Sequence, residues 1–132
     1  MAVKLKQKEG SAAIVGVQAG LTIDHGAGSL SLSEVSGPVQ ITDGAGKMTI
    51  DSAHGPVNIH NKSGGMLITN SSGEATIMTG SGSLEIENYE GQLNVRAGSG
   101  DITVDGVDGD VHLLESGTGK VLIDNVTGQV IQ

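Results

Sequence analysis

The chain has 132 residues and a net charge of −8, and this acidic balance disfavours binding to the phosphate backbone of nucleic acids. It has no Cys and a single aromatic residue, Tyr89, so disulfides, thiolate metal sites and a core of large rings are excluded. No apolar run approaches the roughly 20 residues that a membrane span needs. The length predicts one domain, residues 1–132, located in the cytoplasm, or outside the cell or on its surface if a leader was removed.

Glycine recurs every nine residues along the chain. The series is Gly10, Gly28, Gly37, Gly46, Gly55, Gly64, Gly73, Gly82, Gly91, Gly100 and Gly109, with Ala19 in the one gap; after a one-residue insertion near Glu115 to Thr118 come Gly119 and Gly128. The third and fifth residues of every unit are aliphatic, at 29 positions from Val3 to Val130. Their neighbours are mostly polar, so each unit predicts a strand of about five residues with one buried face, then a turn of about four.

The eighth residue of the units alternates between two chemistries. In one set it is mostly glycine: Gly26, Gly44, Lys62, Gly80 and Gly98. In the other it is mostly apolar: Val17, Val35, Ala53, Ser71, Tyr89, Val107 and Val126. Two alternating edges predict an all-β, two-sided parallel β-solenoid with eighteen residues per coil, about seven and a half coils and, at ~4.8 Å per coil, a rod about 35 Å long. We expect the glycine edge to hold positive φ angles.

In the segment GSGDITVDGVDGDVHLLESGTGKVLIDNVTGQV, glycine and paired aliphatic residues recur at a regular spacing. This spacing is similar to that of a bacterial family of adhesin-type β-strand repeats. The chain resembles this family from about Gly28 onward. The resemblance implies a β-solenoid, often at the cell envelope, without known catalytic residues, and it assigns a role to no residue of this chain.

A calcium-binding β-roll is a first alternative, because such rolls also repeat every nine residues. Their motif requires an Asp at the sixth place of each unit, and here that place varies. Glu87, Asp105 and Asp124 are predicted to stack on consecutive coils, where a solvated acidic face is favoured over a cation site. The histidines, His25, His54, His60 and His112, fall at different places of the repeat and are expected on the surface. The sequence therefore predicts no metal and no cofactor.

Catalysis and ice binding are also disfavoured. The core positions are aliphatic, and no long loop interrupts the period to build a cleft around a nucleophile and a base. The outward positions mix Thr with Gln, Asn, Glu and Leu, and so lack the regular threonine array that ice binding asks for. We expect a protein that is not an enzyme.

The two ends of the repeat carry no recognisable cap such as a helix or a charged plug, although solenoid ends expose unpaired backbone. Either the segment belongs to a longer protein, or the ends pair with each other. Three of the seven basic residues lie on the first strand, and nine of the fifteen acidic residues lie between Glu85 and Asp124, so head-to-tail contact would join opposite charges. Lysines at a strand edge also block strand addition, so this feature supports either reading.

We favour a non-enzymatic structural subunit that stacks end to end, as a head-to-tail homopolymer, into a filament or extracellular fibre. The expected assembly interface comprises Val3, Lys4, Leu5, Lys6, Lys8, Val121, Ile123, Val130 and Ile131. The alternative is an envelope or adhesin-type binding module, excised from a larger protein, whose ligand is a surface glycan or a protein. Neither nucleic acid nor membrane insertion is expected.

Overall fold

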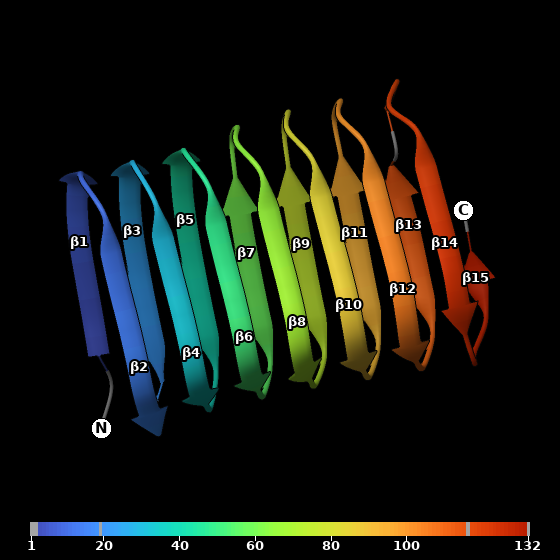
Figure 1. Ribbon diagram of the computed structural model, residues 1–132, viewed down its shortest axis with the longest axis horizontal. Helices are drawn as coiled ribbons and strands as arrows, with labels where there is room; N and C mark the ends of the chain where they lie inside the picture. The colour runs from blue at the N-terminus through green and yellow to red at the C-terminus, as the bar shows by residue number, and fades with distance from the viewer. Residues whose placement is uncertain (1–2, 19, 116, 132) are drawn as a thin grey trace.

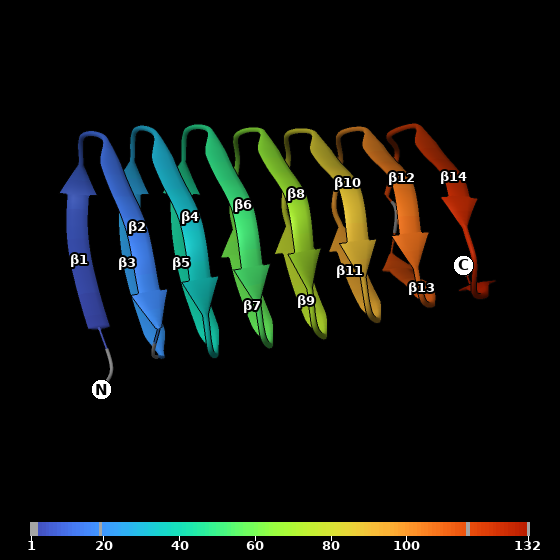
Figure 2. The ribbon, with the colours of Figure 1, turned by 60° about the horizontal axis from the view of Figure 1, so that its bottom comes forward.

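The computed structural model describes residues 3–18, 20–115 and 117–131 as a two-sided parallel β-solenoid, a rod with its N- and C-terminal ends at opposite tips (Figure 1). All its described elements are strands that alternate between two facing sheets (Figure 2). The eight-stranded sheet, called sheet A, contains β1 (Val3–Glu9), β3 (Leu21–Ala27), β5 (Val39–Ala45), β7 (Val57–Asn61), β9 (Ala75–Thr79), β11 (Leu93–Ala97), β13 (Val111–Glu115) and β15 (Val130–Ile131). The seven-stranded sheet, called sheet B, contains β2 (Ala12–Gln18), β4 (Leu30–Ser36), β6 (Met48–His54), β8 (Met66–Ser72), β10 (Leu84–Glu90), β12 (Ile102–Asp108) and β14 (Val121–Val126).

The register of the strands confirms the eighteen-residue coil. Val3 lies opposite Leu21, and Leu21 lies opposite Val39, so equivalent residues stack directly on successive coils. The third and fifth residues of the units in the middle of the rod point inward, and Leu30, Ile59 and Leu93 are each no more than 1% exposed. A single aliphatic core therefore runs along the rod between the two sheets, each layer shared by adjacent coils.

The apolar edge forms as the sequence predicts, because Val35, Ala53, Tyr89 and Val107 are all buried there. Tyr89 donates its hydroxyl to the Gly73 carbonyl at 2.7 Å, and burial raises the pKa of that hydroxyl to about 12. The residue before each of these positions has a left-handed backbone. Its φ is 50–58° at Glu34, Ser52, Asn70, Asn88 and Asn125, and 73° at Gly106, which precedes Val107. This twist lets two consecutive inward positions be three residues apart instead of two.

The expectation of positive φ at the glycine edge is wrong for its eighth-position glycines. The residues with positive φ do not include Gly98, whose place in the column is set by steric contact: a Cβ there would lie 2.6 Å from the Gly80 carbonyl oxygen. Positive φ occurs instead at the nine-residue glycine series, as at Gly64 with φ 103°. Beyond β5 the strands of sheet A also become shorter, with five residues in β7, β9, β11 and β13.

Two adjacent glycines provide a test of this backbone requirement. A Cβ on Gly64 would lie 2.0 Å from the Gly46 carbonyl oxygen, and the backbone at Gly64 has a positive φ that a side chain would strain. A Cβ on Gly65, in contrast, meets nothing within 4 Å. We expect Gly64→Ala to lower the free energy of unfolding by about 1–3 kcal/mol or more. Gly65→Ala should leave it unchanged or raise it by about 0.4–1 kcal/mol. Urea unfolding followed by circular dichroism measures both, and equal midpoints would contradict the assigned backbone.

Candidate functional site

The residues predicted for assembly occupy the two tips of the rod and do not meet within one chain (Figures 1 and 2). Val3, Lys4, Leu5, Lys6 and Lys8 lie on β1, the edge of sheet A; Val121 and Ile123 lie on β14, the last strand of sheet B; Val130 and Ile131 lie on β15, the last strand of sheet A. Val3 is 36% exposed, Val130 41% and Ile131 47%, while Leu5, Val121 and Ile123 are partly buried. Both tips therefore present aliphatic side chains to solvent.

The acidic column predicted on sheet B forms in the expected register. Glu87 lies opposite Asp105, and Asp105 lies opposite Asp124, all on the exposed face. A side-chain hydrogen bond and repulsion from Glu85, together with repulsion from Asp105, raise the pKa of the Glu87 carboxyl. Across the described part of the chain, no group of three or more His, Asp or Glu residues is arranged to hold a metal ion. Within the same ranges no helix is long and apolar enough to cross a membrane.

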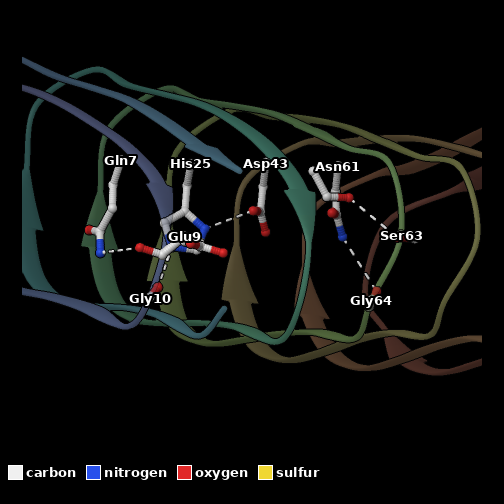
Figure 3. A network of polar contacts seen from close by, with 9 residues as sticks. Gln7, Glu9, Gly10, His25, Asp43, Asn61, Ser63 and Gly64 are labelled. Carbon is white, nitrogen blue, oxygen red and sulfur yellow. Dashed lines mark hydrogen bonds and ion pairs between the residues drawn. The ribbon is translucent and has the colours of Figure 1, made fainter. Parts of the chain in front are cut away.

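A buried polar column is the most distinctive chemical feature of the interior. His25, Asp43, Asn61 and Thr79 follow one another on β3, β5, β7 and β9, and each is at most 5% exposed. Figure 3 shows the first three side chains of this column. The His25 Nδ1 atom lies 3.0 Å from Asp43 Oδ1, and its Nε2 atom lies 2.9 Å from the Gly10 carbonyl oxygen. The expectation that His25 lies on the surface is therefore wrong, because this imidazole is paired inside the solenoid.

The protonation of the His25–Asp43 pair follows from its partners. The Gly10 carbonyl can only accept, so Nε2 of His25 carries a proton. Burial lowers the pKa of His25, but the hydrogen bonds to Asp43 and Gly10 and the Asp43 charge outweigh it, so the pKa is raised overall. For the Asp43 carboxyl, burial raises the pKa. The hydrogen bond and charge of His25 oppose this effect but do not cancel it. Both groups thus hold a proton more tightly in the folded chain.

The rest of the column is incompletely paired within the protein. Asp43 Oδ2, Asn61 Oδ1 and Thr79 Oγ1 are buried and have no hydrogen-bond partner among the described residues. Asn61 Nδ2 makes only a long contact of 3.4 Å to the Gly64 carbonyl. Such groups cost stability rather than supply it, so the column makes sheet A less stable than an aliphatic column would.

The sequence contains a pattern that predicts this column, although the nine-residue repeat alone does not show it. In sheet A the alternation that points the third and fifth residues inward continues to the seventh residue, and this set is Gln7, His25, Asp43, Asn61, Thr79 and Ala97. In sheet B the left-handed residue interrupts the alternation, and the eighth residue points inward instead. When the four histidines are compared only by their position in the repeat, the pairing of His25 with Asp43 is not apparent. It becomes apparent once the seventh residues of the sheet A units are known to point inward.

Two hollows on the outer face of sheet A differ in chemistry. The larger, of about 420 Å³, lies over the first halves of β3, β5, β7 and β9, and its side chains include Pro38, Gln40, Asn58 and one charged residue, Glu74. The smaller, of about 300 Å³, lies near the glycine edge further along the rod and is lined by His60, Lys62, Met78, Arg96 and Glu115, among others. The first hollow is nearly uncharged, whereas the second gathers basic groups in an acidic protein.

Comparison with known proteins gives one match. The family model described as Toastrack DUF4097, a β-solenoid-type repeat family of unknown function, matches residues 1–106. No curated protein matches the chain. No solved structure matches it either. The match starts well before Gly28, and most of the segment that suggested an adhesin-type family lies beyond its end. Since the model covers more than half of the sequence and the repeat geometry agrees with it, the chain belongs to the Toastrack DUF4097 family.

Proposed function

We propose that this protein is a non-enzymatic structural subunit that stacks end to end into a filament. The observation that supports the proposal is the pair of open parallel edges at the tips of the rod. β1 and β2 are the first strands of their sheets, and β15 and β14 are the last. Among the described residues, the strand at each tip has a neighbouring strand on one side only, and the tips carry partly exposed aliphatic side chains. This is the kind of surface that strand addition uses.

The columns of the two tips are compatible in sheet A. Val3 begins the column that ends, through Val111, at Val130, so a second copy placed on β15 continues the same aliphatic layer. Val121 and Ile123 belong instead to the sheet B column that begins at Ala12 and Ile14, two residues that sequence reasoning left out of the interface. Because sheet A has eight strands and sheet B seven, such a junction pairs sheet A directly and leaves sheet B one strand short.

Charge also supports a head-to-tail orientation. Lys4, Lys6 and Lys8 are exposed on β1. The acidic residues of β10, β12 and β14 lie toward the opposite tip. Complementary charge of this kind orients partners and speeds their encounter more than it adds affinity. A non-enzymatic role is supported by the position of the His25–Asp43 pair, whose side chains are fully buried and therefore inaccessible to a substrate.

A proline at Val130 tests the proposal at the backbone. Along sheet A the first residue of a strand donates its N–H to the carbonyl of the residue just before the next strand of the sheet, as Val111 does to the Gln129 carbonyl at 2.8 Å. By the same pattern the Val130 N–H faces away from β13, toward the place of an added strand. Val130→Pro should therefore stop filament growth while the inner coils stay folded. Val130→Ala keeps the donor and is the matched control.

The measurement is filament length by negative-stain electron microscopy at micromolar concentration, with circular dichroism to confirm folding. We expect filaments for the parent and for Val130→Ala, and short particles for Val130→Pro. Raising the salt concentration should shorten filaments without abolishing them, because salt screens the lysines but not backbone pairing or apolar burial. A parent chain that stays monomeric at high concentration in several salts would contradict stacking.

An envelope or adhesin-type binding module is the second candidate. The hollows on the outer face of sheet A favour it, because they lie on the side of the rod, where stacking leaves them open. A surface glycan or a protein would be its ligand. A monomeric parent that binds such a ligand through sheet A would replace the filament proposal with this one.

A further inference from the structure

The two residues that break the repeat in sheet A lie at the same place on the surface. Lys62 stands in a column that is otherwise glycine at Gly26, Gly44, Gly80 and Gly98. One extra residue within β13, at Leu114, shifts the position of Glu115. Both residues line the hollow of about 300 Å³, together with His60, Met78 and Arg96. Departures from a repeat that meet in one hollow point to a role beyond folding.

Packing does not account for the lysine. A Cβ placed on Gly44, Gly80 or Gly98 would lie 2.4–2.6 Å from a carbonyl oxygen of the preceding coil, so this column favours glycine. At Lys62 the coil still closes, with the Lys62 N–H donating to the Asp43 carbonyl and the Ser63 N–H to the Gly44 carbonyl, each at 3.0 Å. The fold therefore accommodates the lysine without requiring it.

The insertion turns Glu115 toward Arg96. Val95 lies opposite Leu113, and an uninterrupted register would set Leu114 opposite Arg96; instead the register shifts and Arg96 lies opposite Glu115. The Arg96 Nε atom is 3.9 Å from Glu115 Oε1, and the two side chains are 48% and 65% exposed. A long, solvated contact of this kind is weak, so the guanidinium remains available to a better-placed anion.

The electrostatics of the hollow differ from those of the whole chain. The net charge is −8, yet Lys62 and Arg96, two of the four basic residues outside β1, meet here beside His60. Met78, 37% exposed, lies between His60 and Arg96 in the register of β7, β9 and β11 and adds an apolar surface. A volume of about 300 Å³ is at the lower end of the range for small-molecule sites.

We propose that this hollow binds the carboxylate or phosphate group of a small ligand. Arg96 offers a forked donor that matches both oxyanions, and Lys62 adds a second positive charge. The ligand anion replaces Glu115 beside the guanidinium, and an apolar part of the ligand covers Met78. The site lies on the side of the rod, so it is independent of stacking at the tips.

The probes are inorganic phosphate and succinate, titrated separately at constant ionic strength into isotopically labelled protein and followed by amide chemical shifts. We expect saturable shifts at residues 61–63 and at Arg96 with a dissociation constant in the millimolar range for at least one probe. The stronger probe identifies the ligand class as phosphate or carboxylate. Repeating the titration on Val130→Pro separates binding from assembly, because that variant is designed not to stack.

Three variants locate the site. Arg96→Gln should weaken binding about tenfold, because it removes the charged fork. Lys62→Gly restores the glycine column, so the chain should fold as before while its affinity falls several-fold. Glu115→Gln should tighten binding, because the internal competitor of the ligand loses its charge. Lys47→Gln is the matched control, since Lys47 borders a separate hollow on sheet B, and it should leave the affinity unchanged.

Two results would overturn the proposal. One is a parent chain whose shifts do not saturate with either probe, and the other is a loss of affinity in Lys47→Gln equal to that in Arg96→Gln. Circular dichroism and the urea midpoint of each variant show whether it is folded, and Lys62→Gly provides a test in a chain whose fold is expected to be intact.

Discussion

Ile59→Asp should prevent folding. Ile59 lies on β7 in the middle of the rod, is 0% exposed, and stacks between Ile41 and Ile77 in sheet A. A carboxylate at this place would have no partner within an aliphatic column, and burying it costs several kcal/mol. Since a domain is stable by only about 5–15 kcal/mol, we expect the variant to be unfolded or absent from the soluble fraction.

His60→Asp is the matched control, because the next residue along β7 points outward and is exposed. The same new charge should change the urea midpoint little, as expected for a surface substitution, within about 0.5 kcal/mol. Circular dichroism and urea unfolding compare both variants with the parent. Similar behaviour of the two would mean that the inward and outward faces of β7 are assigned wrongly.

The fold was largely predictable because one physical requirement repeats along the chain. A strand with one buried face needs period-two alternation, and two coil edges of different shape need a period of eighteen. Leu30, Ile59 and Leu93 are buried, as the two periods predict, and Tyr89 is buried at the apolar edge. The error over φ has a local cause. Contact with the carbonyl of the preceding coil excludes a side chain at Gly98, and contact between coils is not visible from glycine spacing alone.

The buried polar column was harder to predict, because it depends on where the alternation breaks. In sheet B, left-handed residues such as Glu34 and Asn88 move the inward position from the seventh to the eighth residue of the unit, and the described strands of sheet A contain no such residue. The sequence pattern alone does not show this difference between the sheets. The orientation of the seventh residue therefore could not be predicted, and His25 was expected on the surface, where histidines usually lie. The basic hollow depends on a register shift between Val95 and Arg96, a tertiary detail that the insertion signals but does not define.

The free energy of unfolding should decrease as the pH rises above 6.5. The folded pKa of His25 lies above its ordinary value of 6.5, so its protonated form stabilises the fold fully below that pH, and the contribution is lost as the pH rises through the raised pKa. The pKa of Asp43 is also raised, so its ionisation opposes folding in the same direction. Urea unfolding at a series of pH values measures this slope, and a stability that is flat or rises from pH 6 to 8 would contradict it.

The two halves of the pair should respond very differently to substitution. His25→Leu leaves the Asp43 carboxylate buried without its partner, which we expect to cost about 3–5 kcal/mol at neutral pH. Asp43→Asn should cost far less, because a neutral imidazole can still donate from Nε2 to the Gly10 carbonyl and accept at Nδ1 from the new amide. That variant should also lose most of the slope between pH 6 and 8, since no buried carboxylate then holds the imidazolium. If Asp43→Asn kept the parent's slope, another titrating group would be responsible and the pair would not control stability.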